Sequence, residues 1–184
     1  MAQVDTPISD DELLSSALRQ ARDTRQLRIA AGVRHEIGEL FGELFGDAPC
    51  IVIADENTFA AAGRDAHDAM KASGRKCYEP LVFDPAGLYA EHSYAVRIEE
   101  TLAPGLAIPI AVGSGTINDL TKLAAHRSGR QYLSLGTAAS MDGYTAFGAS
   151  IKFRYERRYP ATVNTEAETE NAARAAAALV GEAN

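Results

Sequence analysis

The sequence contains few cysteines, no long apolar run and no excess of positive charge. Only two of its 184 residues are cysteines, Cys50 and Cys77, and their separation matches no metal-binding spacing. No apolar segment approaches the roughly 20 residues that cross a bilayer. The N-terminal segment MAQVDTPISDDELL is acidic, whereas a signal peptide begins basic and then turns apolar. We therefore expect a cytoplasmic protein that does not enter a membrane.

The charge balance bears on the class of ligand. The formal net charge is -7 and the sequence pI is near 5.1, so the field of the whole molecule repels a polyanion and argues against sequence-independent nucleic-acid binding. A small anion remains compatible, because a few backbone N–H groups bind it locally. With 46% hydrophobic residues, the chain is able to bury a core of its own.

Apolar runs alternate with helical patterns through most of the chain. Strands are expected at LRIAAG from Leu27, at CIVIAD, at YEPLVF, at IPIAV and at QYLSLG, and helices are expected over 9–26, 35–46, 57–74, 90–103 and 118–129. Such alternation predicts an α/β fold with a Rossmann-like parallel sheet and flanking helices. Asn57 is the expected cap of the third helix, and Gly74 is its expected stop.

The alternation ends near residue 150. Residues 1–150 are expected to form an α/β domain, and residues 151–184 a different, partly helical tail. The basic and aromatic residues of IKFRYERRYPATVNT fit an RNA-binding or membrane-binding segment, but four positive charges in a net acidic chain are more simply a solvated segment. The four histidines, His35, His67, His92 and His126, form no i, i+4 pair, so we expect scattered surface histidines and no metal site among them.

Three polar loops follow predicted strands: ADENT, GSGTIND and GTAASMDGYT. Ligands of open parallel sheets bind beyond the carboxyl ends of the strands, so these loops form one site if their strands are neighbours. In GSGTIND, Gly113 and Gly115 are able to take positive φ, and Thr116, Ile117 and Asn118 open a helix whose free N–H groups suit a pyrophosphate. A tight turn capped by Thr116 or Asn118, which replaces the third glycine of G-x-G-x-x-G, is an equal alternative.

Two carboxylates have alternative roles. Asp55 ends a strand, where it is placed either to hold a ribose diol or to cap the next helix. Asp119, expected in the first helical turn, either accepts hydrogen bonds from a ligand or favours the helix dipole and pairs with Lys122. In the third loop, Thr137, Ser140 and Thr145 supply hydroxyl groups, and Asp142 either orients a substrate hydroxyl or forms a turn with Gly143.

Together these motifs resemble a known family. The segment IAVGSGTINDLTKLAAHRSGRQYLSLGTAASMDGYTAFGASI, with VIADENTFAAAG upstream, is similar to the sn-glycerol-1-phosphate dehydrogenases of the dehydroquinate synthase-like and iron-containing alcohol dehydrogenase superfamily. The resemblance implies an α/β domain that binds NAD or NADP, a helical domain that holds zinc or nickel, and reduction of dihydroxyacetone phosphate. It implies a small-molecule phosphate substrate and allows a homodimer.

Carried over by position, the resemblance implies roles for individual residues. It makes Asp142 the substrate-binding aspartate, and Gly136 and Ala146 depart from the proline and serine usual in the family. The implied NAD(P) contacts are Asp55, Gly115, Thr116, Ile117, Asn118, Asp119, Thr137, Ala138, Ala139 and Ser140, next to the Gly113 of the glycine loop.

The tail does not resemble the family's helical domain. The family's metal ligands, a later aspartate and two histidines, have no counterpart after residue 151. Because the metal polarises the substrate oxygen, we expect these 184 residues to be inactive alone. The alternatives are an NAD(P)-binding module, an inert remnant, or a domain whose helical partner comes from another chain.

Overall fold

A computed structural model describes residues 12, 15–16, 18–19, 23–138 and 144. Residues up to Arg154 belong to one compact unit, and Tyr155–Asn184 form a second unit that lies outside the described residues. The elements are η1 (Val33–His35), α2 (Ile37–Phe45), β1 (Cys50–Asp55), α3 (Glu56–Thr58), η2 (Phe59–Gly63), α4 (Arg64–Ala72), β2 (Leu81–Phe83), α5 (His92–Leu102), β3 (Ile108–Gly113), α6 (Gly115–Arg127) and β4 (Leu133–Gly136).

The four strands form one parallel sheet in the order β2-β1-β3-β4. The predicted parallel α/β fold is therefore confirmed. From β1 the chain moves outward to β2, and it then returns to the other side of β1 to form β3 and β4. The point at which this direction reverses lies between β1 and β3, and the carboxyl edge of the sheet at such a point is where open α/β folds bind ligands.

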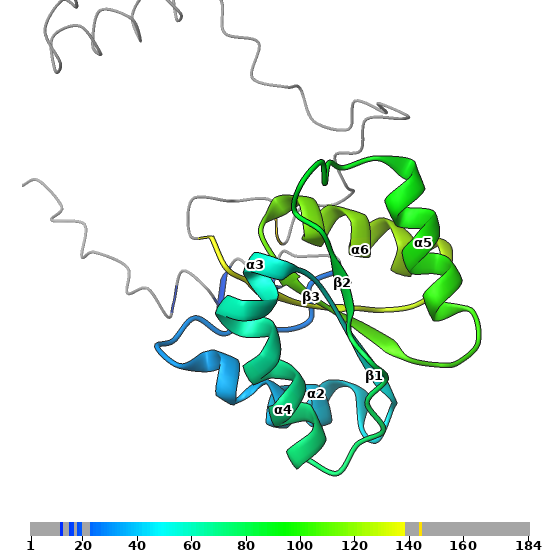
Figure 1. Ribbon diagram of the computed structural model, residues 1–184. Helices are drawn as coiled ribbons and strands as arrows, with labels where there is room; N and C mark the ends of the chain where they lie inside the picture. The colour runs from blue at the N-terminus through cyan, green and yellow to red at the C-terminus, as the bar shows by residue number, and fades with distance from the viewer. Residues whose placement is uncertain (1–11, 13–14, 17, 20–22, 139–143, 145–184) are drawn as a thin grey trace, which may run out of the picture. The chain divides into compact units, whose positions relative to one another are not determined.

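Side chains of the central strands alternate between two hydrophobic cores. On β1, Ile51 and Ile53 face α5 and α6, whereas Val52 and Ala54 face α2 and α4. This period of two is the natural consequence of the pleated backbone, and a strand covered on both faces is apolar throughout. Figure 1 shows the two helical layers on opposite sides of the sheet. CIVIAD is therefore a continuous apolar run because both of its faces are buried.

Two arginines fasten the segments around the amino ends of the strands. The Arg130 guanidinium donates to the carbonyl oxygens of Leu102 and Ala107, at 2.8 and 2.9 Å, and also to that of Gly105. Arg75 donates to the carbonyls of Gly46 and Gly38, at 3.0 and 3.2 Å. These charged donors add hydrogen bonds to carbonyl groups of helices and loops, and the Leu102 carbonyl also accepts from the Gly105 N–H at 3.3 Å.

Several expected boundaries are wrong. LRIAAG is not a strand: Leu27 and Ile29 are exposed, and Arg28 pairs with Glu43 of α2 at 3.0 Å. Asn57 does not cap the third predicted helix, because Asp55 does so two residues earlier. That helix contains a π-helical segment, η2, and Gly74 follows its end with φ +78°, as expected.

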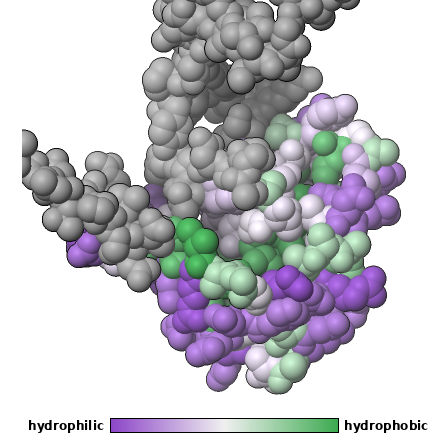
Figure 2. All heavy atoms as spheres, turned by 90° about the vertical axis from the view of Figure 1, so that its left-hand side faces the viewer, coloured by the Kyte–Doolittle hydropathy of each residue, from purple (hydrophilic) through white to green (hydrophobic). Residues whose placement is uncertain are grey.

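The described residues bear on two further expectations. Of the predicted first helix, residues 12, 15–16 and 18–19 are described and helical. Among the helices that the structure describes, none combines the length and apolar character needed to span a membrane. Figure 2 views the side on which α2 and α4 lie and shows hydrophilic side chains over the lower part of that face.

Candidate functional site

The carboxyl edge of the sheet brings the three predicted loops together. Ile53 pairs with Ala111, so Asp55 and Gly113, each two residues further on, end neighbouring strands at the same level. Gly113 in turn pairs with Gly136 at the end of β4. The loops after β1, β3 and β4 are therefore consecutive along one edge, as the sequence predicted on condition that their strands were neighbours.

The junction between β1 and α3 is closed by its own side chains. The Asp55 Oδ1 atom accepts from the Thr58 N–H at 2.9 Å, and the Thr58 hydroxyl accepts from the Asp55 N–H at 3.1 Å. This reciprocal capping box satisfies two backbone donors that a helix start otherwise leaves open. The capping alternative for Asp55 is thus confirmed, and its Oδ2 atom is not used by the capping box.

The junction between β3 and α6 is open. Ser114 occupies the N-cap position with extended backbone, φ -83° and ψ -165°, but its side chain makes no capping hydrogen bond. The first N–H to bond within the helix is that of Asn118, which reaches the Ser114 carbonyl at 3.1 Å. The preceding N–H groups, those of Gly115, Thr116 and Ile117, therefore point out of the helix end. The positive end of the helix dipole adds to their attraction for an anion.

Gly113 matters in this loop because of its small size, and neither glycine has an unusual backbone angle. Neither Gly113 nor Gly115 has positive φ, so that expectation is wrong. A Cβ atom at Gly113 would lie 2.6 Å from the Cβ atom of Ile117. Gly113 is therefore required because the first turn of α6 passes close above the end of β3.

Asn118 is buried and does not cap the helix. The helix begins at Gly115, three residues before the expected start, which places Asn118 inside it at 1% exposure. Its Oδ1 atom accepts from the Ser134 hydroxyl at 3.0 Å and from the Tyr132 hydroxyl at 3.3 Å. Burial raises the pKa of Tyr132, with Asp119 adding to the rise, so this hydroxyl keeps its proton for the bond. The predicted cap at Asn118 is wrong; its side chain joins α6 to β4.

Asp119 lies in the second turn of α6, not in the first as predicted. Its Oδ1 atom is 3.9 Å from the Lys122 ammonium group, which confirms the expected pairing at long range. Burial lowers the pKa of Lys122, and Asp119 opposes that effect. Its distance from the helix start weakens the predicted interaction with the dipole.

Tyr144 joins the ends of β3 and β4. Its hydroxyl lies 3.2 Å from the Gly113 carbonyl, to which it donates, and accepts from the Ala138 N–H at 3.2 Å. The Gly113 carbonyl also accepts from the Thr137 N–H at 3.1 Å. A Cβ atom at Gly136 would lie 2.8 Å from the Tyr144 ring, so glycine at this position makes room for the tyrosine.

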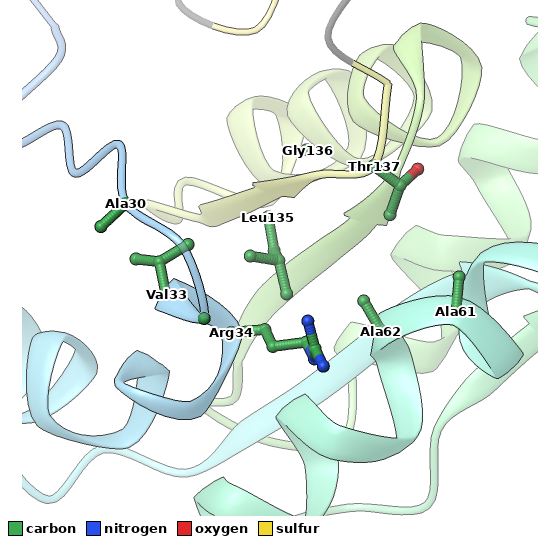
Figure 3. Close-up of a pocket in the computed structure, with 9 residues that line it drawn as sticks. Ala30, Val33, Arg34, Ala61, Ala62, Leu135, Gly136 and Thr137 are labelled. Carbon is green, nitrogen blue, oxygen red and sulfur yellow. The ribbon is translucent and has the colours of Figure 1, made fainter.

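A pocket of about 250 Å³ adjoins the end of β4. Figure 3 shows the Arg34 guanidinium group pointing into it, toward Ala62. The Arg34 Nε atom donates to the Asp65 Oδ2 atom at 2.8 Å, which orients the guanidinium group. Small residues and glycines form most of the remaining wall: Ala30, Gly32, Ala61, Ala62 and Gly136, with Val33, Leu135 and Thr137. The pocket thus offers a cation and space beside Thr137.

Within the described residues, no three His, Cys, Asp or Glu side chains group closely enough to hold a metal ion. His35 and His126 are exposed, as predicted, but His67 is buried at 7% exposure. It belongs to the buried residues of α4, with Ala66 and Met70, so the expectation of a surface histidine is wrong at this position.

Other predicted residues lie outside the described part of the chain. Ala139, Ser140, Asp142 and Ala146 belong to this group. Sequence reasoning missed Tyr144 and Arg34, although the single aromatic residue in a loop of small residues was a signal for the first. Arg34 carried no signal, because its segment was expected to follow a strand that does not form.

Three comparisons place the chain among known proteins. The iron-containing alcohol dehydrogenase family matches residues 28–172. Glycerol-1-phosphate dehydrogenase of Bacillus velezensis, whose name specifies NAD(P)+, is 30% identical over 137 residues, or 73% of this chain and 34% of that protein. The enzyme of the same name from Thermococcus kodakarensis is 34% identical over 102 residues, or 55% of this chain and 28% of that one.

A solved structure supports the fold. Glycerol dehydrogenase from Schizosaccharomyces pombe has a TM-score of 0.50 and 19% identity, with coverage of 60% of this chain and 28% of that chain. The chain spans about a third or less of the length of the curated relatives it matches.

Proposed function

The chain belongs to the iron-containing alcohol dehydrogenase family, and on that premise we propose that the carboxyl edge of its sheet binds NAD(P) for an oxidoreductase. The observation that carries the proposal is the open start of α6 at the point where the strand order reverses. There the N–H groups of Gly115, Thr116 and Ile117 hold the pyrophosphate. The names of the curated relatives, which specify NAD(P)+, agree with this cofactor.

Neighbouring residues hold the remainder of the cofactor. The Oδ2 atom of Asp55 accepts a hydrogen bond from a ribose hydroxyl, while its Oδ1 atom stays in the capping box. Through its bond to the Ser134 hydroxyl of β4, Asn118 keeps α6 in place beside the crevice, and Asp119 follows it on the same helix. Thr137, Ala138, Ala139 and Ser140 continue the contact from the end of β4. Bound NADH or NADPH supplies the hydride for reduction.

For the substrate, we propose dihydroxyacetone phosphate, reduced to sn-glycerol 1-phosphate. This proposal is supported by the names of the curated relatives. Asp142 orients a substrate hydroxyl, and the Arg34 guanidinium beside Thr137 attracts the phosphate. The described residues do not fit the zinc or nickel of the family, so no step is assigned to a metal.

A matched pair of variants tests the cofactor site. Gly115→Pro removes one of the open N–H groups, and proline suits the first position of a helix, while the extended backbone of Ser114 suits a residue before proline. Gly115→Ala keeps the N–H group. By calorimetric titration, we expect NADH or NADPH to bind, and Gly115→Pro to lose about 1.5 kcal/mol, or about tenfold in Kd, relative to Gly115→Ala.

The absence of binding by the unaltered chain would contradict the proposal. If both variants and the unaltered chain bound the nucleotide with equal affinity, the ligand would have to bind away from the start of α6. Circular dichroism of each variant distinguishes these outcomes from loss of the fold.

The second candidate is an NAD(P)-binding module without turnover. It is favoured by the absence of a metal-ligand group among the described residues. The decisive assay follows NADPH oxidation with dihydroxyacetone phosphate and added Zn²⁺ or Ni²⁺. Turnover that Asp142→Ala abolishes supports the enzyme, whereas nucleotide binding without turnover supports the module.

A further inference from the structure

The two cysteines lie together at the end of the sheet opposite the candidate site. Cys50 is the first residue of β1, and Cys77 precedes β2. They pair as an isolated parallel bridge, and their Sγ atoms are 3.3 Å apart although 27 positions separate them in the sequence. Both are free thiols, and the proposed binding of NAD(P) uses neither.

The backbone holds this pair in register. The Cys50 N–H donates to the Lys76 carbonyl at 3.0 Å, and the Tyr78 N–H donates to the Cys50 carbonyl at 2.9 Å. These two bonds flank Cys77 on both sides. Neighbouring strands lie about 4.8 Å apart, which falls within the Cα separation of about 4.4 to 6.8 Å that disulfides span. Closing a bond therefore requires little backbone movement.

We infer that Cys50 and Cys77 form a reversible redox site, which a low-molecular-weight disulfide such as glutathione disulfide converts to an intramolecular disulfide. The inference rests on the Sγ separation and on the bridge between the two segments. It is independent of the proposed dehydrogenase function.

The chemistry balances in two exchange steps. The partly exposed Cys77 loses its proton, and its thiolate attacks one sulfur of glutathione disulfide and releases one glutathione thiolate. The Cys50 thiolate then attacks the Cys77 sulfur of the mixed disulfide and releases the second glutathione. The two protein thiols have lost two protons and two electrons, and glutathione disulfide has gained both electrons.

The surroundings of the cysteines set the order of these steps. Burial raises the pKa of the Cys50 thiol to about 12, and the neighbouring Cys77 adds to the rise. A buried thiol of this kind is a poor first nucleophile. Cys50 therefore acts second, when the mixed disulfide lies directly against it.

The bond would link β1 to the segment before β2 and enclose α3, η2 and α4. A closed loop of this length restricts the unfolded chain, so we expect the Tm to rise by about 5 °C or more on oxidation. Asp55, at the opposite end of β1, is remote from the bond. Nucleotide affinity should therefore change by less than about twofold, within the scatter expected for independent sites.

The test equilibrates the reduced full chain with glutathione disulfide, then denatures it, alkylates it with iodoacetamide and measures the intact mass. We expect no alkylated cysteine, a mass lower by two hydrogens, a monomer-sized chain and a higher Tm, all reversed by dithiothreitol. Cys50→Ser should instead carry one glutathione on Cys77.

Three results would overturn the inference: alkylation of both cysteines after oxidation, two glutathione adducts without an internal bond, or oxidation that lowers the Tm. Because Cys50 is buried, a Cys50→Ser variant that unfolds would not be informative. In that case Cys77→Ser supplies the comparison, and it should show no internal disulfide while Cys50 stays free of glutathione in the native chain.

Discussion

Two strands of the sheet pass into helices in similar ways but leave opposite kinds of helix start. After β1, Asp55 and Thr58 bind one another's backbone and close the first turn of α3. After β3, Ser114 leaves the first turn of α6 uncapped. The closed start stabilises itself, whereas the open start keeps its donors available for an external anion. The two junctions thus differ by whether one side chain caps the helix, and only the uncapped start has the proposed binding role.

The largest effect is expected when the uncapped start of α6 is given a capping side chain, which removes the difference between the two junctions. Ser114→Asp places a carboxylate where Asp55 stands in the other loop, and it should cap α6 and repel a pyrophosphate. We expect the Kd for NADH to rise about 30-fold, or about 2 kcal/mol, while the free energy of unfolding rises slightly. Calorimetry and urea denaturation measure the two effects. Ser114→Thr, which adds no charge, is the control, and equal affinity of the two variants would refute the explanation.

The second way tests why a glycine ends β3. Gly113→Ala introduces a Cβ atom 2.6 Å from that of Ile117, and we expect the free energy of unfolding to fall by about 1.5 kcal/mol. Urea denaturation measures the loss. In the double variant with Ile117→Gly, the two effects should sum to less than their separate values, because the second change removes the Cβ atom that clashes. Strict additivity would show that the crowding is unimportant.

The third test removes the capping box at the start of α3. Asp55→Ala removes the acceptor for the Thr58 N–H and should lower the free energy of unfolding by about 1 kcal/mol. Asp55→Asn keeps an acceptor oxygen and should retain most of that stability. If the proposed ribose contact is correct, both variants weaken nucleotide binding. An unchanged stability of Asp55→Ala would show that the capping box contributes little.

The smallest effect concerns the helix that continues from the closed junction. Burial lowers the pKa of His67 below its ordinary value of 6.5, and Lys71 acts in the same direction, while Asp68 and Glu79 oppose it. As the pH falls through 6.5, the unfolded chain binds a proton at His67 more readily than the folded chain, so stability falls. Above that pH both states are neutral and the contribution is constant.

His67→Gln should remove this part of the pH dependence. Urea denaturation between about pH 5.5 and 8 measures it, over the range in which histidine titrates. His126→Gln, which alters an exposed histidine, is the matched control. An identical slope in the unaltered chain and in His67→Gln would contradict the assignment.

The sheet could be predicted from the sequence because its central strands are buried on both faces. CIVIAD and IPIAV are apolar without interruption, and the helices between them have clear periods. LRIAAG has a similar composition but forms no strand, since apolar content alone does not specify a pairing partner. Because a strand was wrongly predicted there, the position of Arg34 in the pocket was not predicted.

The site could be predicted only at the level of its loops. Adjacency of β1, β3 and β4 fixed where the loops meet, but the caps depended on single side chains. Asp55 and Ser114 both suit an N-cap by residue type, and only the structure separates the one that bonds from the one that does not. Asn118 looked like a helix start because amides favour caps, yet it lies inside the helix and accepts from two hydroxyls, that of Tyr132 just before β4 and that of Ser134 within β4.

The arginines at the amino ends of the strands have a consequence for how this fold varies. Arg75 binds carbonyls at both ends of α2, and Arg130 binds carbonyls within residues 102–107, so these anchoring bonds lie remote from the carboxyl edge. Loops at that edge can then accept substitutions without unfolding the domain. Tolerance to substitution is thereby expected at the carboxyl edge, where a change of ligand preference would arise. A deep mutational scan of folding should find Arg130 far more sensitive than Ser114 or Thr137.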